Sequence, residues 1–225
     1  MSFTKEVESL AEEIVSFSRS RHTVGRTFDD LLTYALHRFS LNAEPLGRDQ
    51  WPYGEQENRW FTQILSRISE LTVTQEDSDN FVDVLGELYM AFVAGRYDRQ
   101  AFGQYFTPVS IATLMASVLY PKDAESICDP CCGSGRLLLA GAKGNADIVC
   151  FGNDLDSICT KMCACNLLLH GRRGVVTRGN TLSCDYFGGY AVNTPTGNSA
   201  LDSLPHILVL SAQEAAAVWM TRSPS

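Results

Sequence analysis

The sequence predicts an α/β fold, in which a partial parallel sheet of about four strands is wrapped by helices and preceded by an α-helical N-terminal region. Residues 1–100 carry apolar side chains at helical spacing, whereas from residue 101 onward short apolar runs alternate with helical segments. Such alternation is typical of a parallel sheet with helices on its faces. We therefore expect a helical subdomain over residues 1–100 and an α/β domain over residues 101–225 that is incomplete at its C-terminus.

The N-terminal region contains four apolar stripes. The first stripe runs from Phe3 to Phe17 and the second from Leu31 to Phe39, while residues 60–71 and 81–93 supply two more. Residues 42–57 are rich in Pro, Gly and polar side chains, which predicts a long loop. Aromatic and Leu stripes at this spacing indicate ordinary helix packing.

The α/β domain begins with a predicted helix over residues 111–119. Strands are then expected at residues 126–128, 148–151, 175–178 and 206–210, with helices at 136–142 and 157–170 between them. Residues 185–205 are full of Gly, Asn, Thr, Ser and Pro, which predicts a flexible insertion.

The last predicted strand raises the question of what covers it. A strand order of 3-2-1-4 leaves residues 206–210 exposed on one edge, and an apolar edge strand invites pairing. We expect a second copy of the chain, a partner subunit or the C-terminal helix to cover it.

Composition limits the classes of function. The 225 residues include 26 acids and 18 bases, and the net charge of −8 argues against a broad nucleic-acid groove on this chain alone. Four scattered bases leave room only for local, weak DNA contact: Lys161, Arg172, Arg173 and Arg178. Without a long apolar window or a secretion signal, the protein is expected to be cytoplasmic, with no membrane partner.

All eight cysteines lie in the C-terminal half. Their spacing does not match standard zinc knuckles, and several of them fall in predicted strands and a helix. We therefore expect free thiols and no metal.

The segment Asp129-Pro-Cys-Cys-Gly-Ser-Gly135 is the strongest functional signal, because an apolar strand ends on an acid and a Gly-rich turn before a helix begins. Gly133 and Gly135 let the backbone approach a bound molecule closely. A second apolar run ends on Asp154, where a carboxylate would grip a ribose diol. Two neighbouring strand ends of this kind predict one pocket for a nucleotide-like ligand.

Three spaced segments together resemble the N6-adenine DNA methyltransferases, above all the modification subunits of type I restriction systems. They are Phe102-Gly-Gln-Tyr-Phe-Thr-Pro108, the turn that begins at Asp129, and Asn166-Leu-Leu-Leu-His-Gly171. The similarity runs from about Phe81 through Leu182. It implies a Rossmann-like methyltransferase domain, S-adenosylmethionine as cofactor, and methyl transfer to adenine N6 in DNA.

The resemblance also implies the cofactor-binding residues. The segment Tyr105, Phe106, Thr107 and Pro108 would lie near the methionine end, and Asp129 near its amino group, where a carboxylate makes a favourable charge-assisted hydrogen bond. Asp154 would accept both ribose hydroxyls. Asn180 resembles the residue that reads the adenine amino group. The complete expected set is Tyr105, Phe106, Thr107, Pro108, Asp129, Pro130, Cys131, Gly133, Gly135, Asp154, Leu155 and Asn180.

The chain departs from the family pattern where the target base should bind. Family members carry Asn-Pro-Pro-Phe, or a variant with Asp or Tyr, after the fourth strand, so that a polar side chain grips the target amine and a ring stacks on the flipped base. Here the strand 206–210 runs into Ser211, and Glu214 offers no ring. The nearest alternative, Asn193-Thr-Pro-Thr196, precedes that strand. The catalytic residues therefore stay unassigned.

Three functions remain open from the sequence. The first is a methyltransferase family member that retains the cofactor half and needs a partner for turnover. The second is a non-catalytic module that binds S-adenosylmethionine or pairs with a modification subunit. The third is methylation of protein or RNA amines, which the same fold supports.

Overall fold

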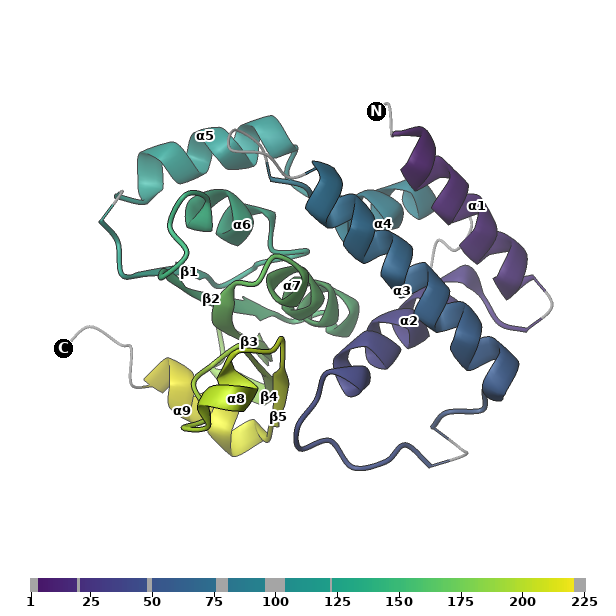
Figure 1. Cartoon of the computed structure of the whole chain (residues 1–225). Coiled ribbons are helices and arrows are strands. Elements are labelled where there is room, and N and C mark those ends of the chain that lie inside the picture. Colours follow the sequence, from purple (N-terminus) through teal and green to yellow (C-terminus); the bar gives the residue numbers. More distant parts are fainter. Residues whose placement is uncertain are drawn as a thin grey trace.

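The computed structural model describes residues 4–19, 21–47, 50–75, 81–95, 104–121 and 123–220. A helical part and a sheet-containing part lie side by side, with the N-terminus on the first and the C-terminal helix on the second (Figure 1). Three residues of the predicted patterns, Phe3, Phe102 and Gly103, lie outside the described residues, as does the predicted boundary near residue 100.

The described residues of the N-terminal part form four helices: α1 (Lys5–Ser18), α2 (Val24–Arg38), α3 (Glu55–Gln75) and α4 (Val84–Gly95). The hydroxyls of Thr4 and Thr23 accept hydrogen bonds from backbone N–H groups in the first turns of α1 and α2, which explains where these helices begin. The predicted stripes face one another, and the side chains of Phe28, Phe61 and Phe92 are fully buried. This packing matches the expected helical region.

The C-terminal part follows the predicted alternation. Its elements are α5 (Val109–Leu119), β1 (Ser126–Asp129), α6 (Arg136–Ala142), β2 (Val149–Asp154), α7 (Ser157–Leu169), β3 (Arg173–Asn180), β4 (Asp185–Val192), α8 (Ser199–Asp202), β5 (Ile207–Leu210) and α9 (Ala212–Met220). Strands β1, β2 and β3 are parallel, so the α/β class predicted from the sequence is confirmed.

The predicted strand order is wrong. Within the described ranges, the sheet has five strands in the order β1-β2-β3-β4-β5, and β4 and β5 are each antiparallel to the preceding strand. Residues 185–192, expected in a flexible insertion, form β4 because a tight turn after Asn180 folds the chain back onto β3. A hairpin partner needs only a short connection, so β4 takes the place beside β3 and directs β5 to the far edge, away from β1.

A segment of this chain that the sequence did not suggest, residues 39–42, lies along the edge at β5. The backbone N–H of Ile207 donates to Phe39 O at 2.9 Å, and Leu41 N–H donates to Ile207 O at 2.9 Å. The side chain of Asn42 exchanges two hydrogen bonds with the backbone of Val209, at 2.8 and 3.0 Å. The C-terminal helix α9 packs mainly against β4 and also touches β5. Its Trp219 donates to Thr177 Oγ1 on β3 at 2.6 Å.

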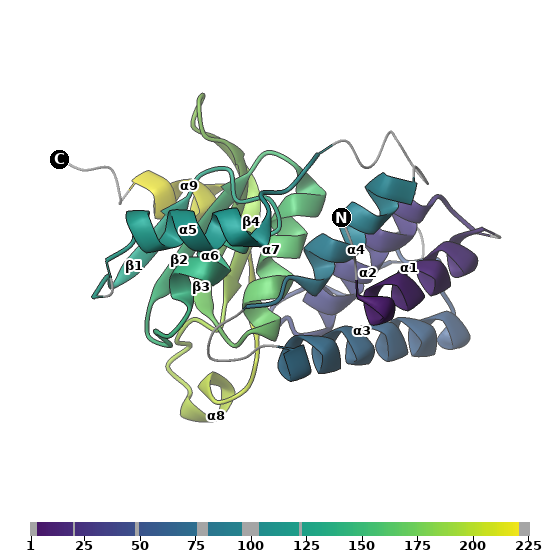
Figure 2. The same ribbon diagram turned by 90° about the horizontal axis from the view of Figure 1, so that it is seen from above.

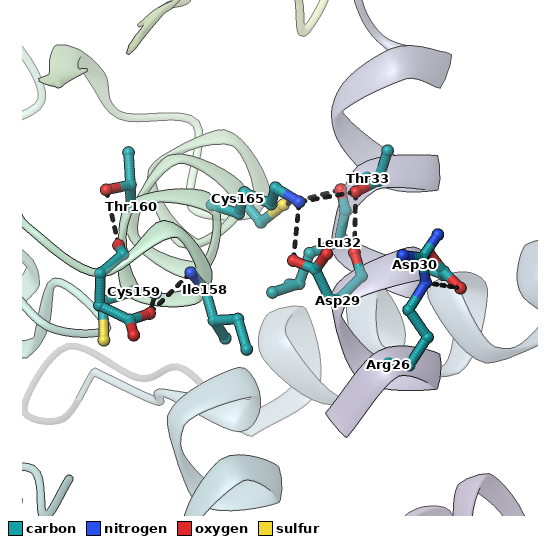
Figure 3. A network of polar contacts seen from close by, with 11 residues as sticks. Arg26, Asp29, Asp30, Leu32, Thr33, Ile158, Cys159, Thr160 and Cys165 are labelled. Atoms are coloured by element: carbon teal, nitrogen blue, oxygen red, sulfur yellow. Dashed lines mark hydrogen bonds and ion pairs between the residues drawn. The ribbon is translucent and has the colours of Figure 1, made fainter. Parts of the chain in front are cut away.

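Helix α7 joins the two parts, because it contacts β2, β3 and β4 and also α2 and α4. Figure 2 shows it between the sheet and the N-terminal helices. The ammonium of Lys161 on α7 donates to Asp29 at 2.7 Å and to Thr33 at 2.9 Å on α2 (Figure 3). The charge of Lys161, one of four bases considered for phosphate contact, is therefore paired across this interface.

Candidate functional site

A cavity of about 450 Å³ lies at the carboxyl ends of β1 and β2, where the turn after β1 meets the segment before α5. This volume falls within the range of small-molecule sites, roughly 300–1,000 Å³. The strands end on Asp129 and Asp154, which both line the cavity. The lining residues are Gln104, Tyr105, Phe106, Thr107, Met115, Asp129, Cys131, Cys132, Gly133, Ser134, Arg136, Leu137 and Asp154.

The turn between β1 and α6 has a left-handed backbone at two glycines. The φ angle is +54° at Gly133 and +90° at Gly135, a region that side chains with a Cβ rarely adopt. A Cβ on Gly133 would lie 3.1 Å from the ring of Phe106, and one on Gly135 would lie 2.9 Å from Cys163 Sγ. These glycines therefore let the turn pack against the protein's own side chains, whereas the sequence suggested room for a ligand as the reason.

Asp154 connects the two strand ends. Its Oδ2 accepts the backbone N–H of Gly133 at 2.9 Å, and its Oδ1 accepts the backbone N–H of Asp156 at 2.9 Å. Each carboxylate oxygen has two lone pairs, so one on each oxygen remains for further donors such as a pair of vicinal hydroxyls. The side chain thus fixes the turn and keeps acceptor capacity at the cavity.

Asp129 lies close to that carboxylate. Its Oδ1 accepts the backbone N–H of Cys131 at 3.0 Å, which fixes the first residues of the turn. Burial raises the pKa of the Asp129 carboxyl above its usual value, and the nearby charge of Asp154 raises this pKa further. Two carboxylates facing one cavity favour a ligand that carries positive charge.

Residues 104–108 form a strap across the cavity. Phe106 is buried, with its ring centroid 4.7 Å from that of Tyr89 on α4. Tyr105 is 79% exposed and lines the rim, while the carbonyl of Thr107 accepts Arg136 Nη1 at 3.0 Å. The strap therefore connects the cavity to both α4 and α6.

Five expected residues lie outside the cavity lining. Pro108 directly precedes α5, and Gly135 directly precedes α6. Pro130 O accepts Thr181 Oγ1 at 2.9 Å.

Of the other two, Leu155 directly follows β2, and Asn180 is the last residue of β3. Leu155 is 58% exposed just beyond Asp154. The side-chain oxygen of Asn180 accepts Leu182 N–H at 3.0 Å, so it holds the β3–β4 turn.

The sequence reasoning missed several supporting residues. Ser134 lies inside the Gly-rich turn and Arg136 directly follows it; neither was expected to bind the cofactor, although both line the cavity. Asn153 is 1% exposed, and its amide donates to Gly179 O and Thr181 Oγ1, both at 2.8 Å. Its position in the apolar run before Asp154 was the available signal, because a buried amide needs partners.

The residues considered for gripping a target base are engaged elsewhere. Ser211 donates its N–H and hydroxyl to Glu214 Oε2, at 2.8 and 2.7 Å, as a cap at the start of α9. Asn193 accepts His206 N–H and donates to Arg172 O, both at 3.0 Å. Because β5 lies at the opposite edge from β1, none of these side chains lines the cavity.

The described residues contain neither a metal-binding cluster nor a membrane-spanning helix. Among these residues, no three His, Cys, Asp or Glu side chains gather where they would hold a metal ion. Nor does any helix in the described ranges combine the length and apolar character needed to cross a membrane.

Sequence comparisons find related proteins of one kind. The family described as N-6 DNA Methylase matches residues 80–198, more than half of the chain. The type I restriction enzyme MjaVIII methylase subunit of Methanocaldococcus jannaschii is 31% identical over 123 residues, which cover 52% of this chain and 20% of that protein. The type II methyltransferase M.MamI of Microbacterium ammoniaphilum is 32% identical over 179 residues, covering 65% of this chain and 46% of that protein. The chain thus spans less than half of the length of these relatives.

Solved structures give weaker similarities. A class I S-adenosylmethionine-dependent methyltransferase from Listeria monocytogenes aligns with 80% of this chain and 55% of its own, at 18% identity and a TM-score of 0.47. A modification subunit of a type I restriction enzyme from Vibrio vulnificus aligns with 81% of this chain and 57% of its own, at 18% identity and a TM-score of 0.44.

Proposed function

We propose that this chain, which belongs to the N-6 DNA methylase family, binds S-adenosylmethionine, the methyl donor of that family, in the cavity between β1 and β2. The observation that carries the proposal is the pair of strand-end carboxylates, Asp129 and Asp154, around the left-handed turn at Gly133. The type of side chain at each position suits one part of this cofactor.

The residues present fit the cofactor. The spare lone pairs of Asp154 suit the two ribose hydroxyls, which are donors that lie side by side. Asp129 suits the ammonium of the methionine part, because a partly buried carboxylate gains most from a charge-assisted hydrogen bond. The exposed ring of Tyr105 and the strap around Phe106 offer apolar surface above the turn.

The proposed reaction is methyl transfer to adenine N6 in DNA. When bound, S-adenosylmethionine supplies a methyl group that is already activated by its sulfonium. This chain's contribution is positioning, which means holding the donor in one orientation at the end of β1 and excluding water from it. The grip on the target base is expected to come from a partner, because Ser211, Glu214 and Asn193 are engaged elsewhere.

A second candidate is a non-catalytic module that binds the cofactor or pairs with a modification subunit. The lack of a target-base grip favours this candidate. The chain carries no Asn-Pro-Pro-Phe segment, and no described side chain takes its place at the cavity. Both candidates share the cofactor site and differ only in chemistry.

Calorimetry with S-adenosylmethionine, followed by a labelled-methyl transfer assay on DNA, tests the proposal. We expect binding by the chain alone and little transfer. The partner to add is a modification subunit that keeps its target-base motif but whose own cofactor turn is disabled. Methyl transfer to adenine after this addition would support the enzyme, whereas cofactor binding without transfer under every condition would support the module. The absence of binding heat would contradict cofactor binding in both candidates.

The affinity for S-adenosylmethionine should depend on pH through Asp129. The pKa of this carboxyl is raised by burial, so on acidification it takes up a proton at a higher pH than an ordinary carboxyl with a pKa of 3.8. Once protonated, Asp129 no longer pairs with the ammonium, and affinity should fall as the pH drops through the raised pKa. Calorimetry across a pH series measures this.

The variant Asp129→Asn is the control for the pH series. It should bind more weakly at neutral pH and show no change over the range in which the unaltered protein loses affinity. If both proteins follow the same pH curve, Asp129 is not the group that faces the ammonium.

A further inference from the structure

One carboxylate of the N-terminal helical region reaches the turn that forms the cofactor site. Asp83 stands directly before α4, and its side chain is fully buried. Its Oδ2 accepts Ser134 Oγ at 2.5 Å and Arg136 Nε at 2.6 Å. Both donors belong to the turn and helix that follow β1, more than fifty residues further along the chain.

The other oxygen of Asp83 is also fully used. Its Oδ1 accepts the backbone N–H of Gly86 at 2.7 Å and Asn166 Nδ2 at 2.8 Å. Asn166 lies on α7 and donates again, through the same nitrogen, to Ser134 O at 2.8 Å. A carboxylate has about four lone-pair sites, so Asp83 has a donor for each of them and fixes α4, α7 and the turn relative to one another.

Arg136 carries this connection to the strap. Its Nε pairs with Asp83 in a buried ion pair, and its Nη1 donates to Thr107 O at 3.0 Å. The planar guanidinium therefore links the carboxylate to the strap in a fixed geometry. The ring of Phe106, in the same strap, meets Tyr89 of α4.

The partners of Asp83 are groups of the cavity itself, which an ion pair with only a structural role would not require. Arg136 and Ser134 line the cavity, and Gly133, beside Ser134, donates its N–H to Asp154. A shift of Ser134 would therefore move the N–H group that orients the expected ribose-binding carboxylate. A displacement of about 1 Å at such a site is enough to lose much of its function.

From this geometry we infer that Asp83 is a positioning residue for S-adenosylmethionine binding, which sets the conformation of the 133–136 turn and of the strap from the helical region. The inference rests on the proposed function. It makes the helical region part of the cofactor site, although none of the residues that the structure describes before Gln104 lines the cavity.

Calorimetric titration of the full-length chain with S-adenosylmethionine tests the inference, together with circular dichroism to establish that each variant is folded. Asp83→Asn keeps the shape of the side chain but loses two acceptor sites and the charge. We expect its dissociation constant to rise by about tenfold or more at a temperature where the variant is fully folded, because donors on the turn lose their partner.

Asp30→Asn is the matched control. Asp30 is also a buried carboxylate of the helical region with an arginine partner, since it accepts Arg26 Nε at 3.0 Å and Tyr53 Oη at 2.7 Å. Neither of these partners lines the cavity. We expect a lower melting temperature with a dissociation constant within about twofold of the unaltered protein. Equal losses of affinity in both variants would mean that stability alone is responsible, and would overturn the inference.

The double variant Asp83→Asn/Arg136→Met covers the case in which Asp83→Asn does not fold, because an unpaired buried arginine is strongly destabilising. Removing both charges should restore much of the melting temperature, yet affinity should stay low, since Ser134 Oγ loses the Asp83 carboxylate and Thr107 O loses the guanidinium of Arg136. Recovery of full affinity by the double variant, or unchanged affinity in Asp83→Asn, would overturn the inference while leaving the proposed function intact. An unaltered protein that does not bind S-adenosylmethionine would overturn the proposed function and the inference with it.

Discussion

Replacement of Gly133 by valine should abolish S-adenosylmethionine binding. The φ angle of +54° at this position is strained for a β-branched residue by roughly 1–3 kcal/mol. The added Cβ would lie 3.1 Å from the ring of Phe106, and the branch methyls need still more room. To relieve the backbone strain and the contact with Phe106, the turn must move. The hydrogen bond from the N–H of residue 133 to Asp154 would then be lost. Calorimetry should then show no binding heat at concentrations that saturate the unaltered protein.

The helices before the strap should remain folded in this variant. The fully buried Phe28, Phe61 and Phe92 belong to α2, α3 and α4, whereas the substitution lies in the turn between β1 and α6. Far-ultraviolet circular dichroism should therefore show nearly unchanged helix content.

The matched control for this substitution is Gly144→Val. Gly144 also has a left-handed backbone, with φ of +75°, but a Cβ there meets nothing within 4 Å, and the residue does not line the cofactor cavity. This variant should lose a similar amount of stability to backbone strain and still bind. Binding by Gly133→Val at normal affinity would mean that the turn has only a structural role.

The parallel part of the sheet could be predicted because each strand carries its own local signal. The apolar runs that end at Asp129 and Asp154 are bounded by helices with clear starts, such as the N-cap at Asp156, whose carboxylate accepts two backbone N–H groups. The carboxyl ends of neighbouring parallel strands meet at one edge, so two acids at these ends predicted one cavity. This part of the site needed no long-range information.

Strand β4 could not be predicted in the same way. Its Gly188-Gly189 pair was read as a loop signal, whereas a Cβ on Gly189 would lie 2.5 Å from Val176 O, so the glycine allows close approach to β3. The position of β5 depended on that hairpin and was wrong for the same reason. Asn42 pairs with the edge of β5 at Val209, which is 167 residues away in sequence. No local sequence pattern can predict such a contact.

The residues that hold the cavity in shape could not be predicted from the sequence either. Asp83 lies in an otherwise apolar helical pattern, and its four donors come from three separate segments. A motif shows which residues stand beside a ligand, but the partners of a buried carboxylate depend on the tertiary fold. The sequence therefore indicated the strand-end acids and the turn, and left out the groups that hold the turn in place.

The second large effect is expected from Asp154→Ala, which should weaken S-adenosylmethionine binding by about 1–3 kcal/mol, or roughly fivefold to 150-fold, as measured by calorimetry. Two losses combine in this variant. The ribose hydroxyls would lose their acceptors, and the N–H of Gly133 would lose the oxygen that it donates to at 2.9 Å. The affinity of Asp154→Asn for S-adenosylmethionine should lie between those of Asp154→Ala and the unaltered protein, since an amide keeps one oxygen that can accept hydrogen bonds.

Asp156→Ala separates this effect from a general weakening of the same loop. Asp156 lies two residues away and caps α7 through Ile158 and Cys159, but it does not line the cavity. Loss of this cap should cost about 1 kcal/mol of unfolding free energy and leave the affinity unchanged. If Asp154→Ala binds as tightly as the unaltered protein, Asp154 does not hold the sugar, and the proposed orientation of the cofactor is wrong. If Asp156→Ala loses as much affinity as Asp154→Ala, the loop conformation and not the ribose contact determines binding.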